Sequence, residues 1–300
     1  MSYVSEVLAD NPSVFLKLDD ATTTFADSSG NGHIQTSSGT LTANQAGFTS
    51  EIVASALFGG GKVAEDFGSA TAYTNLTLEV WYKSTNGNGV LWTSRGVAGN
   101  GLTLFIGATG AGFGSAGQVS WGLDGALYQG VNTNATFNDG QIHHIVAVFS
   151  RASGAISPSD FTIYVDGALQ TVTQHSINGS VNVPFTPSAN WLMGQHPAGW
   201  ANGTLTSTNL AMAALYPAAL TGQRINAHFS ASAIPPAGSV LSRDSVVVLA
   251  SDSTMNRTLA RDSVGVLSND LVITRTLSRM SVQVLVRVPP PRFEGWGVTF

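Results

Sequence analysis

The chain has 300 residues, of which 43% are hydrophobic and only 10% are charged, and it contains 33 glycines and no cysteine. Its net charge is −5 and it has no basic run, which argues against a domain built to neutralise the phosphates of nucleic acid. The absence of cysteine excludes disulfides, thiol nucleophiles and Cys-ligated zinc.

No N-terminal segment combines a basic start with an apolar core, and no apolar run approaches the roughly 20 residues of a membrane span. We therefore expect a soluble protein, made in the cytosol without a signal peptide and without membrane insertion.

The first predicted element is a short helix. Ser2 is a candidate N-cap, the apolar residues that follow recur at helical spacing, and Pro12 stops the helix.

From Val14 to Leu215 the pattern changes to short apolar or β-branched runs separated by Gly, Asn, Asp and Ser, with almost no helical periodicity. This pattern predicts an all-β sandwich, and eight such strands match a jelly roll. The clearest predicted strands are 76–83, 90–94, 102–106, 119–123, 143–149, 161–165, 191–193 and 210–215.

Two local features follow in the second half of this region. The pair Asp166-Gly167 between apolar strands predicts a hairpin with a type I′ turn, whose two central residues need positive φ. Thr221 is a candidate N-cap for a short helix that carries Ile225 and Phe229 on one face and closes the domain near Ala233.

The remainder divides into a Pro- and Gly-containing linker (234–240), three 18-residue repeats (241–288) and a Pro-rich, aromatic tail (289–300). The repeats carry Leu, Arg, Ser, Val, Val and Leu at matching positions, and their alternation describes a strand covered on both faces. Three such units hold too little apolar surface for a core of their own.

Two interpretations of the repeats stay open: a stack of β-hairpins lying on the first domain, or a surface that pairs with other copies or with partner proteins. The large apolar groups of the tail favour the second. The residues expected to take part in assembly are Arg243, Arg261, Arg279, Trp296 and Phe300.

The opening VSEVLADNP followed by FLKLDD resembles that of laminin-G-like, concanavalin A-like jelly-roll domains common in bacteriophage structural proteins. The turn DSSGNG, the strand LTLEVW, the pair His143-His144, the hairpin YVDG and the segment LAMAALYPAALT follow in that family's order. The resemblance covers residues 1–233 and implies a jelly-roll binding module.

The repeats add a second, less specific resemblance, to the minor tail proteins of phages that infect actinobacteria. It implies a virion structural protein, a minor tail or tail-tip component, that contacts other tail proteins, copies of itself and host cell-wall glycan. A fold that is usually extracellular, here without a secretion signal, fits a protein released by lysis. The alternatives are a capsid-surface decoration protein and a glycan-cleaving enzyme.

The enzyme is the less favoured alternative. Laminarinase-like relatives carry carboxylates at alternate positions of one strand, but here Glu79 is alone in its strand and Glu65 and Asp66 point to opposite faces. His143 and His144 also point to opposite faces, so strand geometry does not let them chelate one metal, and one of them is expected in the core. No Gly-x-Ser-x-Gly elbow occurs.

Asp27 and Asn31 lie in a predicted tight turn, where Asx side chains bind backbone amides. In some relatives the corresponding turn helps bind calcium, which would give Asp27, Asn31 and Asp66, with Glu65 as the alternative to Asp66, as ligands of the one cofactor considered, Ca²⁺. The turn interpretation is the favoured one.

Sugar binding needs an exposed aromatic face with polar neighbours. Trp81 is expected in the core. Trp200 lies in a Gly-rich loop and is the best candidate, with a Trp200→Ala change expected to weaken wall binding. The predicted ligand-binding residues are Trp200, His196, Trp121 and Tyr128.

Overall fold

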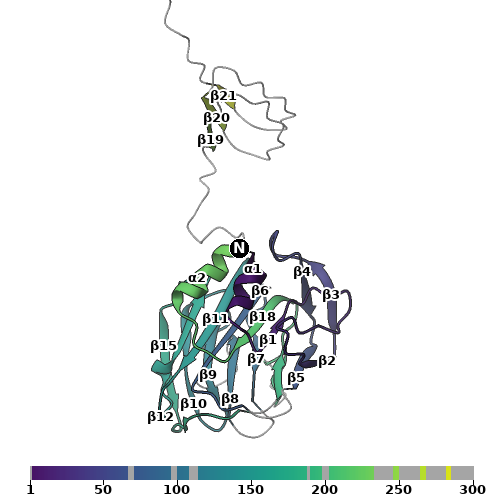
Figure 1. Cartoon of the computed structure of the whole chain (residues 1–300). Helices are drawn as coiled ribbons and strands as arrows, with labels where there is room; N and C mark the ends of the chain where they lie inside the picture. Colours follow the sequence, from purple (N-terminus) through teal and green to yellow (C-terminus); the bar gives the residue numbers. More distant parts are fainter. Residues whose placement is uncertain are drawn as a thin grey trace, which may run out of the picture. The chain divides into compact units, whose positions relative to one another are not determined.

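A computed structural model describes residues 2–66, 71–95, 100–107, 114–187, 190–197 and 203–232, together with the backbone of three short strands further on (246–249, 264–267 and 282–284). The chain divides into two units, Met1–Pro236 and Ala237–Phe300 (Figure 1).

The first unit is a β-sandwich, as the sequence predicts, with two eight-stranded sheets among the described residues. Sheet A has the order β14 (Ala168–Leu169), β13 (Phe161–Val165), β11 (Ile142–Ser150), β6 (Asn75–Ser84), β18 (Thr208–Tyr216), β4 (Ala54–Phe58) and β3 (Leu41–Ala46), with β1 (Val14–Leu16) also paired to β18. Sheet B has the order β15 (Val172–Ile177), β10 (Tyr128–Thr136), β9 (Gln118–Asp124), β8 (Gly101–Ile106), β7 (Gly89–Thr93), β17 (Asn190–Met193), β5 (Lys62–Asp66) and β2 (Ile34–Ser38).

Each of the eight predicted strands overlaps an observed one: β6, β7, β8, β9, β11, β13, β17 and β18. A short pair, β12 (Gly154–Ala155) and β16 (Asn182–Val183), and the 3-10 helix η1 (Pro158–Asp160) complete the β-rich elements.

The core lies between the two sheets. Trp121 of β9 packs edge-on against Phe161 of β13 with ring centroids 5.7 Å apart, and its indole Nε1 donates to the carbonyl of Val148 in β11, 3.0 Å away. Fully burying an aromatic or branched side chain of this kind stabilises the fold by about 1.5–3 kcal/mol.

Two helices lie on the side of sheet A that faces away from this core, beside β6, β11 and β18 (Figure 1). They are α1 (Tyr3–Ala9) and α2 (Gly222–Ala231). Both predicted caps are confirmed: Ser2 Oγ accepts from the Ser5 amide at 3.2 Å, and Thr221 Oγ1 accepts from the Arg224 amide at 3.3 Å.

The predicted hairpin turn is confirmed as well. Asp166 has φ 53° and Gly167 has φ 77°, so both central residues adopt the left-handed conformation of a type I′ turn. The turn connects β13 to β14.

Among the described residues of the second unit, each repeat contributes one strand to a three-stranded sheet of β19 (Val246–Leu249), β20 (Val264–Leu267) and β21 (Val282–Val284). The strands are parallel, with Val246 opposite Val264 and Val264 opposite Val282, so equivalent repeat positions stand side by side. The described strands show how the repeats pair with one another, and both interpretations of the repeats stay predictions. The predicted assembly residues lie outside the described residues.

Candidate functional site

The two faces of sheet B differ in chemistry. Successive side chains of a strand point to opposite faces. Leu104, Trp121 and Val131 belong to the core cluster and mark the inner face. Their strand neighbours form what we call the outer row, a set of mostly polar residues on the other face: Thr103, Phe105, Ser120, Asp124, Tyr128, Asn132 and His175.

At one end of the outer row, Asp124 contacts several polar side chains. Its carboxylate lies 3.2 Å from Nη1 of Arg95 and 2.9 Å from Nε2 of His196, and Thr103 Oγ1 donates to it at 3.4 Å. The His196 ring stacks on Phe105 with centroids 6.2 Å apart. Asp124 is 2% exposed, so its charge is balanced locally by Arg95 rather than by water.

Tyr128 forms the other end of the outer row. A Cβ on Gly130 would lie 2.8 Å from the Tyr128 hydroxyl, so the absence of a side chain at Gly130 makes room for the phenol over the strand. That hydroxyl lies 3.5 Å from the side-chain amide of Asn132, and the Asn132 amide lies 2.8 Å from Nε2 of His175. Burial, followed by the charge of Asp124, raises the pKa of Tyr128, so the phenol remains a donor.

Tyr128 and Asn132 are buried, whereas His175 and Arg95 are partly exposed and lie on opposite sides of the row. The row therefore offers a carboxylate, an amide, an imidazole and a phenol on four neighbouring strands, and Arg95 in an adjoining loop adds a guanidinium. Such a set of donors and acceptors beside aromatic rings suits a hydroxyl-rich ligand.

The predicted ligand-binding residues separate into three groups. The structure brings His196 and Tyr128 to the same face of sheet B. The prediction for Trp121 is wrong, because its side chain is fully buried on the opposite face and its indole is bonded to Val148. Trp200 lies outside the described residues.

The predicted turn at Asp27 is held by its own backbone. Asp27 Oδ1 accepts from the amides of Phe15 and Ser29, and Oδ2 accepts from the His33 amide and the Ser29 hydroxyl. Although burial opposes ionisation, these donors lower the pKa of Asp27.

The other proposed calcium ligands add little to that turn. Asn31 directs its amide nitrogen to the carbonyls of Pro12 and Ser13, and only the backbone of Asp66 is described. Within the described part of the chain, no group of three His, Asp or Glu residues is placed to hold a metal ion. Calcium binding stays a prediction.

A second polar cluster lies between sheet A and the two helices, and its centre is Glu79 of β6. Its Oε1 accepts from the Tyr3 hydroxyl at 2.6 Å and lies 2.7 Å from His144 Nε2. Its Oε2 accepts from the Tyr216 hydroxyl at 2.6 Å and lies 3.0 Å from His228 Nδ1. All five side chains are fully buried.

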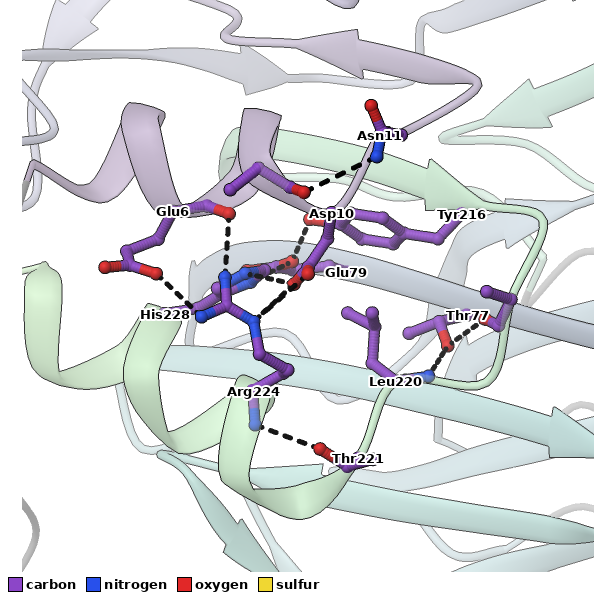
Figure 2. A network of polar contacts seen from close by, with 12 residues as sticks. Glu6, Asp10, Asn11, Thr77, Glu79, Tyr216, Leu220, Thr221, Arg224 and His228 are labelled. Carbon is purple, nitrogen blue, oxygen red and sulfur yellow. Dashed lines mark hydrogen bonds and ion pairs between the residues drawn. The ribbon is translucent and has the colours of Figure 1, made fainter.

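Figure 2 shows how this cluster continues between the helices. Asp10, the C-cap of α1, lies 3.0 Å from His228 Nε2 and 2.9 Å from Arg224 Nε. Arg224 also reaches Glu6 of α1 at 2.9 Å. We call the five residues Glu6, Asp10, Glu79, Arg224 and His228 the helix clamp, because they tie α1 and α2 to each other and to β6.

Glu79 is the one acidic residue of its strand, as the sequence predicts, but the fold surrounds it with polar partners from other elements. Its partners come from residues 65 to 149 positions away, in α1, β11, β18 and α2. Of the two adjacent histidines, His144 is the one in the core, whereas His143 is 9% exposed and bonds Asp166 and Asp139. Trp81 is buried beneath the helices as predicted.

None of the described helices is long and apolar enough to cross a membrane.

Comparison with protein-family models matches residues 59–226 to the laminin G model described as the concanavalin A-like lectin/glucanases superfamily. No curated protein matches the sequence. Among solved structures, the botulinum neurotoxin serotype D/C binding domain is 14% identical, with a TM-score of 0.50 over 74% of this chain and 52% of that one. The serotype C1 binding domain is 13% identical, with a TM-score of 0.51 over 76% and 53%. This chain thus spans about half the length of those domains, and the likeness shows the fold alone.

Proposed function

The chain belongs to the concanavalin A-like lectin/glucanases superfamily, and we propose that it is a binding protein whose outer row on sheet B holds a carbohydrate. The observation that carries the proposal is the convergence of Arg95, Asp124, Asn132 and His175 on the face of sheet B opposite the core. Sugars offer hydroxyls to such donors and acceptors and an apolar face to neighbouring rings.

The charges of the outer row favour a neutral glycan. Arg95 offsets Asp124 at 3.2 Å, so the row has no excess charge to attract an ionic ligand from a distance. The partly exposed His175 and Arg95 are the side chains by which a glycan would first engage the row.

We propose binding without cleavage. Glycosidases place two carboxyl groups about 5–9.5 Å apart across the scissile bond. Asp124 is the one acidic residue in the described strands β7, β8, β9, β10, β15 and β17. Glu65 of β5 pairs across the sheet with Trp191, a core residue, and so points to the inner face.

We also propose that the protein is a virion component, a minor tail or tail-tip protein, because the repeats resemble those of such proteins and their three strands stack in register. Immunolabelling of intact particles tests this. Label at the tail supports the proposal, whereas label on the capsid supports a decoration protein and label on neither overturns both.

Host cell walls and oligosaccharides released from them are the probes for the binding proposal. We expect the purified chain to sediment with walls. We expect His175→Ala and Tyr128→Phe to weaken binding about 5- to 12-fold, since a lost polar contact costs about 1–1.5 kcal/mol. Tyr164→Phe, a partly exposed tyrosine of β13 in the other sheet, is the matched control. Equal binding by all variants would remove the outer row as the site, and release of reducing sugar would establish an enzyme.

A further inference from the structure

The strand β2 ends sheet B, and no described strand covers its outer edge. It pairs with β5 in five consecutive positions, from Ile34 opposite Asp66 to Ser38 opposite Lys62, without a bulge. An edge of this kind presents unpaired backbone N–H and C=O groups at every second residue, which is a template for another strand.

Proteins usually protect such edges with charges, proline, bulges or very short strands. The terminal strands of sheet A follow that rule, because β3 carries a bulge with Asn44 at φ 51° and β14 has two residues. The edge at β2 has none of these protections. No Asp, Glu, Lys, Arg or Pro occurs between Asp27 and Glu51.

The β2 edge also carries an exposed apolar side chain. Ile34 is 74% exposed, more than Val53, Leu169 or Leu8, and it shares a face with the exposed Thr36 and Ser38. The strand at the other end of sheet B, β15, is likewise uncharged and regular, but it has no large exposed apolar residue. A strand added at β2 would cover part of the Ile34 side chain, which favours an interface at this edge.

We propose that β2 pairs antiparallel with β2 of a second copy of this chain, around a two-fold axis at Thr36, the central residue of the strand. Ile34 of one copy then lies opposite Ser38 of the other, diagonal to Thr36. The two copies of sheet B become one continuous sheet through this isologous contact.

A second copy of β2 brings no charged residue to this edge, because the segment between Asp27 and Glu51 contains none. Close approach of the two edges therefore adds no like-charge repulsion at the contact, which matters for two chains that each carry a net charge of −5.

One consequence rests on the proposed function. The dimer carries two outer rows on one continuous sheet, so a polymeric glycan could bind both rows at once, and its apparent affinity for the dimer would exceed its affinity for a single row. The dimer itself is tested without any sugar, so its failure and the failure of glycan binding are separate results.

The first test uses the absence of cysteine from the chain. In the full chain with Thr36→Cys, the two Cα atoms at the axis would lie about 4.5–5.5 Å apart, within the range of a disulfide. We expect mild oxidation to give a covalent dimer that a reductant reverses. Thr42→Cys, an equally exposed threonine on the bulged strand β3, is the matched control and should stay monomeric on a denaturing gel.

The second test reverses charges at the same position. Thr36→Lys and Thr36→Glu should each weaken dimerisation at least tenfold in sedimentation, because like charges would meet at the axis, and an equimolar mixture should restore it. The proposal is overturned if both tests fail, or if Thr36→Cys crosslinks only with a chain carrying Gln174→Cys on β15. That last result would indicate head-to-tail association of the sheets.

Discussion

His228 of α2 holds its Nδ1 3.0 Å from Glu79 Oε2 of β6 and its Nε2 3.0 Å from Asp10 Oδ2 at the end of α1. One imidazole thus joins three elements. Burial alone would lower the pKa of His228, but the charges of Glu79 and Asp10 outweigh it and raise the pKa. A protonated His228 between two carboxylates is therefore the state in which the helix clamp is complete.

Glu79→Gln should destabilise the protein by about 3–5 kcal/mol, because it removes one partner of a buried ion pair and leaves His228 without its counter-charge. The glutamine nitrogen would also face donors where Glu79 offers two acceptor oxygens. Urea unfolding at pH 6 measures the loss. Glu51→Gln, in the loop before β4, should change the free energy of unfolding by less than about 0.5 kcal/mol. Equal effects of the two changes would mean that the clamp contributes nothing.

The wild-type protein should lose stability at alkaline pH because of Glu65, and Glu65→Gln should remove that loss. Burial, only partly opposed by a hydrogen bond from Gln35, raises the pKa of Glu65 to about 8, and no described donor faces its Oε2. A raised pKa contributes stability that is complete below the unfolded value of about 4.3 and is lost as pH rises through about 8.

The wild-type protein should therefore become less stable between pH 5 and pH 9, and Glu65→Gln should flatten that decline by a few kcal/mol. Unfolding in urea at both pH values measures the slope. An unchanged slope would show that Glu65 is already ionised in the folded protein.

His228→Gln tests the clamp histidine in the same way. Because the pKa of His228 is raised, its stabilisation is present below about 6.5 and disappears as pH rises through the folded value. Interactions with His228 and His144 outweigh burial and lower the pKa of Glu79, whose stabilisation is present above about 4.3 and disappears as pH falls through its folded value.

The clamp is thus strongest in mildly acid solution. Ionisation of Glu65 also lowers the stability of the protein as pH rises, so the effect of His228 is measured in the Glu65→Gln variant. In that background, adding His228→Gln should lower stability at pH 5.5 more than at pH 9. A variant whose deficit is the same at both pH values would show that His228 is neutral in the fold.

The sandwich could be predicted because its central strands are apolar on one or both faces, as in β6 and β11. Among the strands that were not predicted, β2, β3, β10 and β15 are rich in Gln, Thr, Ser and Asn and carry little hydrophobic pattern. These segments become strands because adjacent strands offer backbone hydrogen-bond partners. Such contacts between distant parts of the chain override the low strand propensity of the local sequence.

The candidate site was harder to predict for the same reason. Tyr128 and His196 are far apart in the sequence, yet they share a face because β9 brings Asp124 between them. Trp121 is predicted to bind a ligand, but its strand parity directs it to the core. The Glu79 cluster had no local signal, since each partner is distant in the sequence.

Asp27 should stabilise the turn without calcium. Both of its oxygens already accept two donors each, from Phe15, Ser29 and His33. Asp27→Asn would place an amide nitrogen against the His33 N–H or the Phe15 N–H, and leaving a partly buried donor of this kind without an acceptor costs about 1 kcal/mol. We therefore expect Asp27→Asn to lower the melting temperature, and neither chelator nor added calcium to change that of the wild type. A site with Kd about 10⁻⁴ M would instead give about 2.7 kcal/mol of stabilisation in about 10 mM calcium, so a clear rise in melting temperature would establish calcium as a ligand of Asp27.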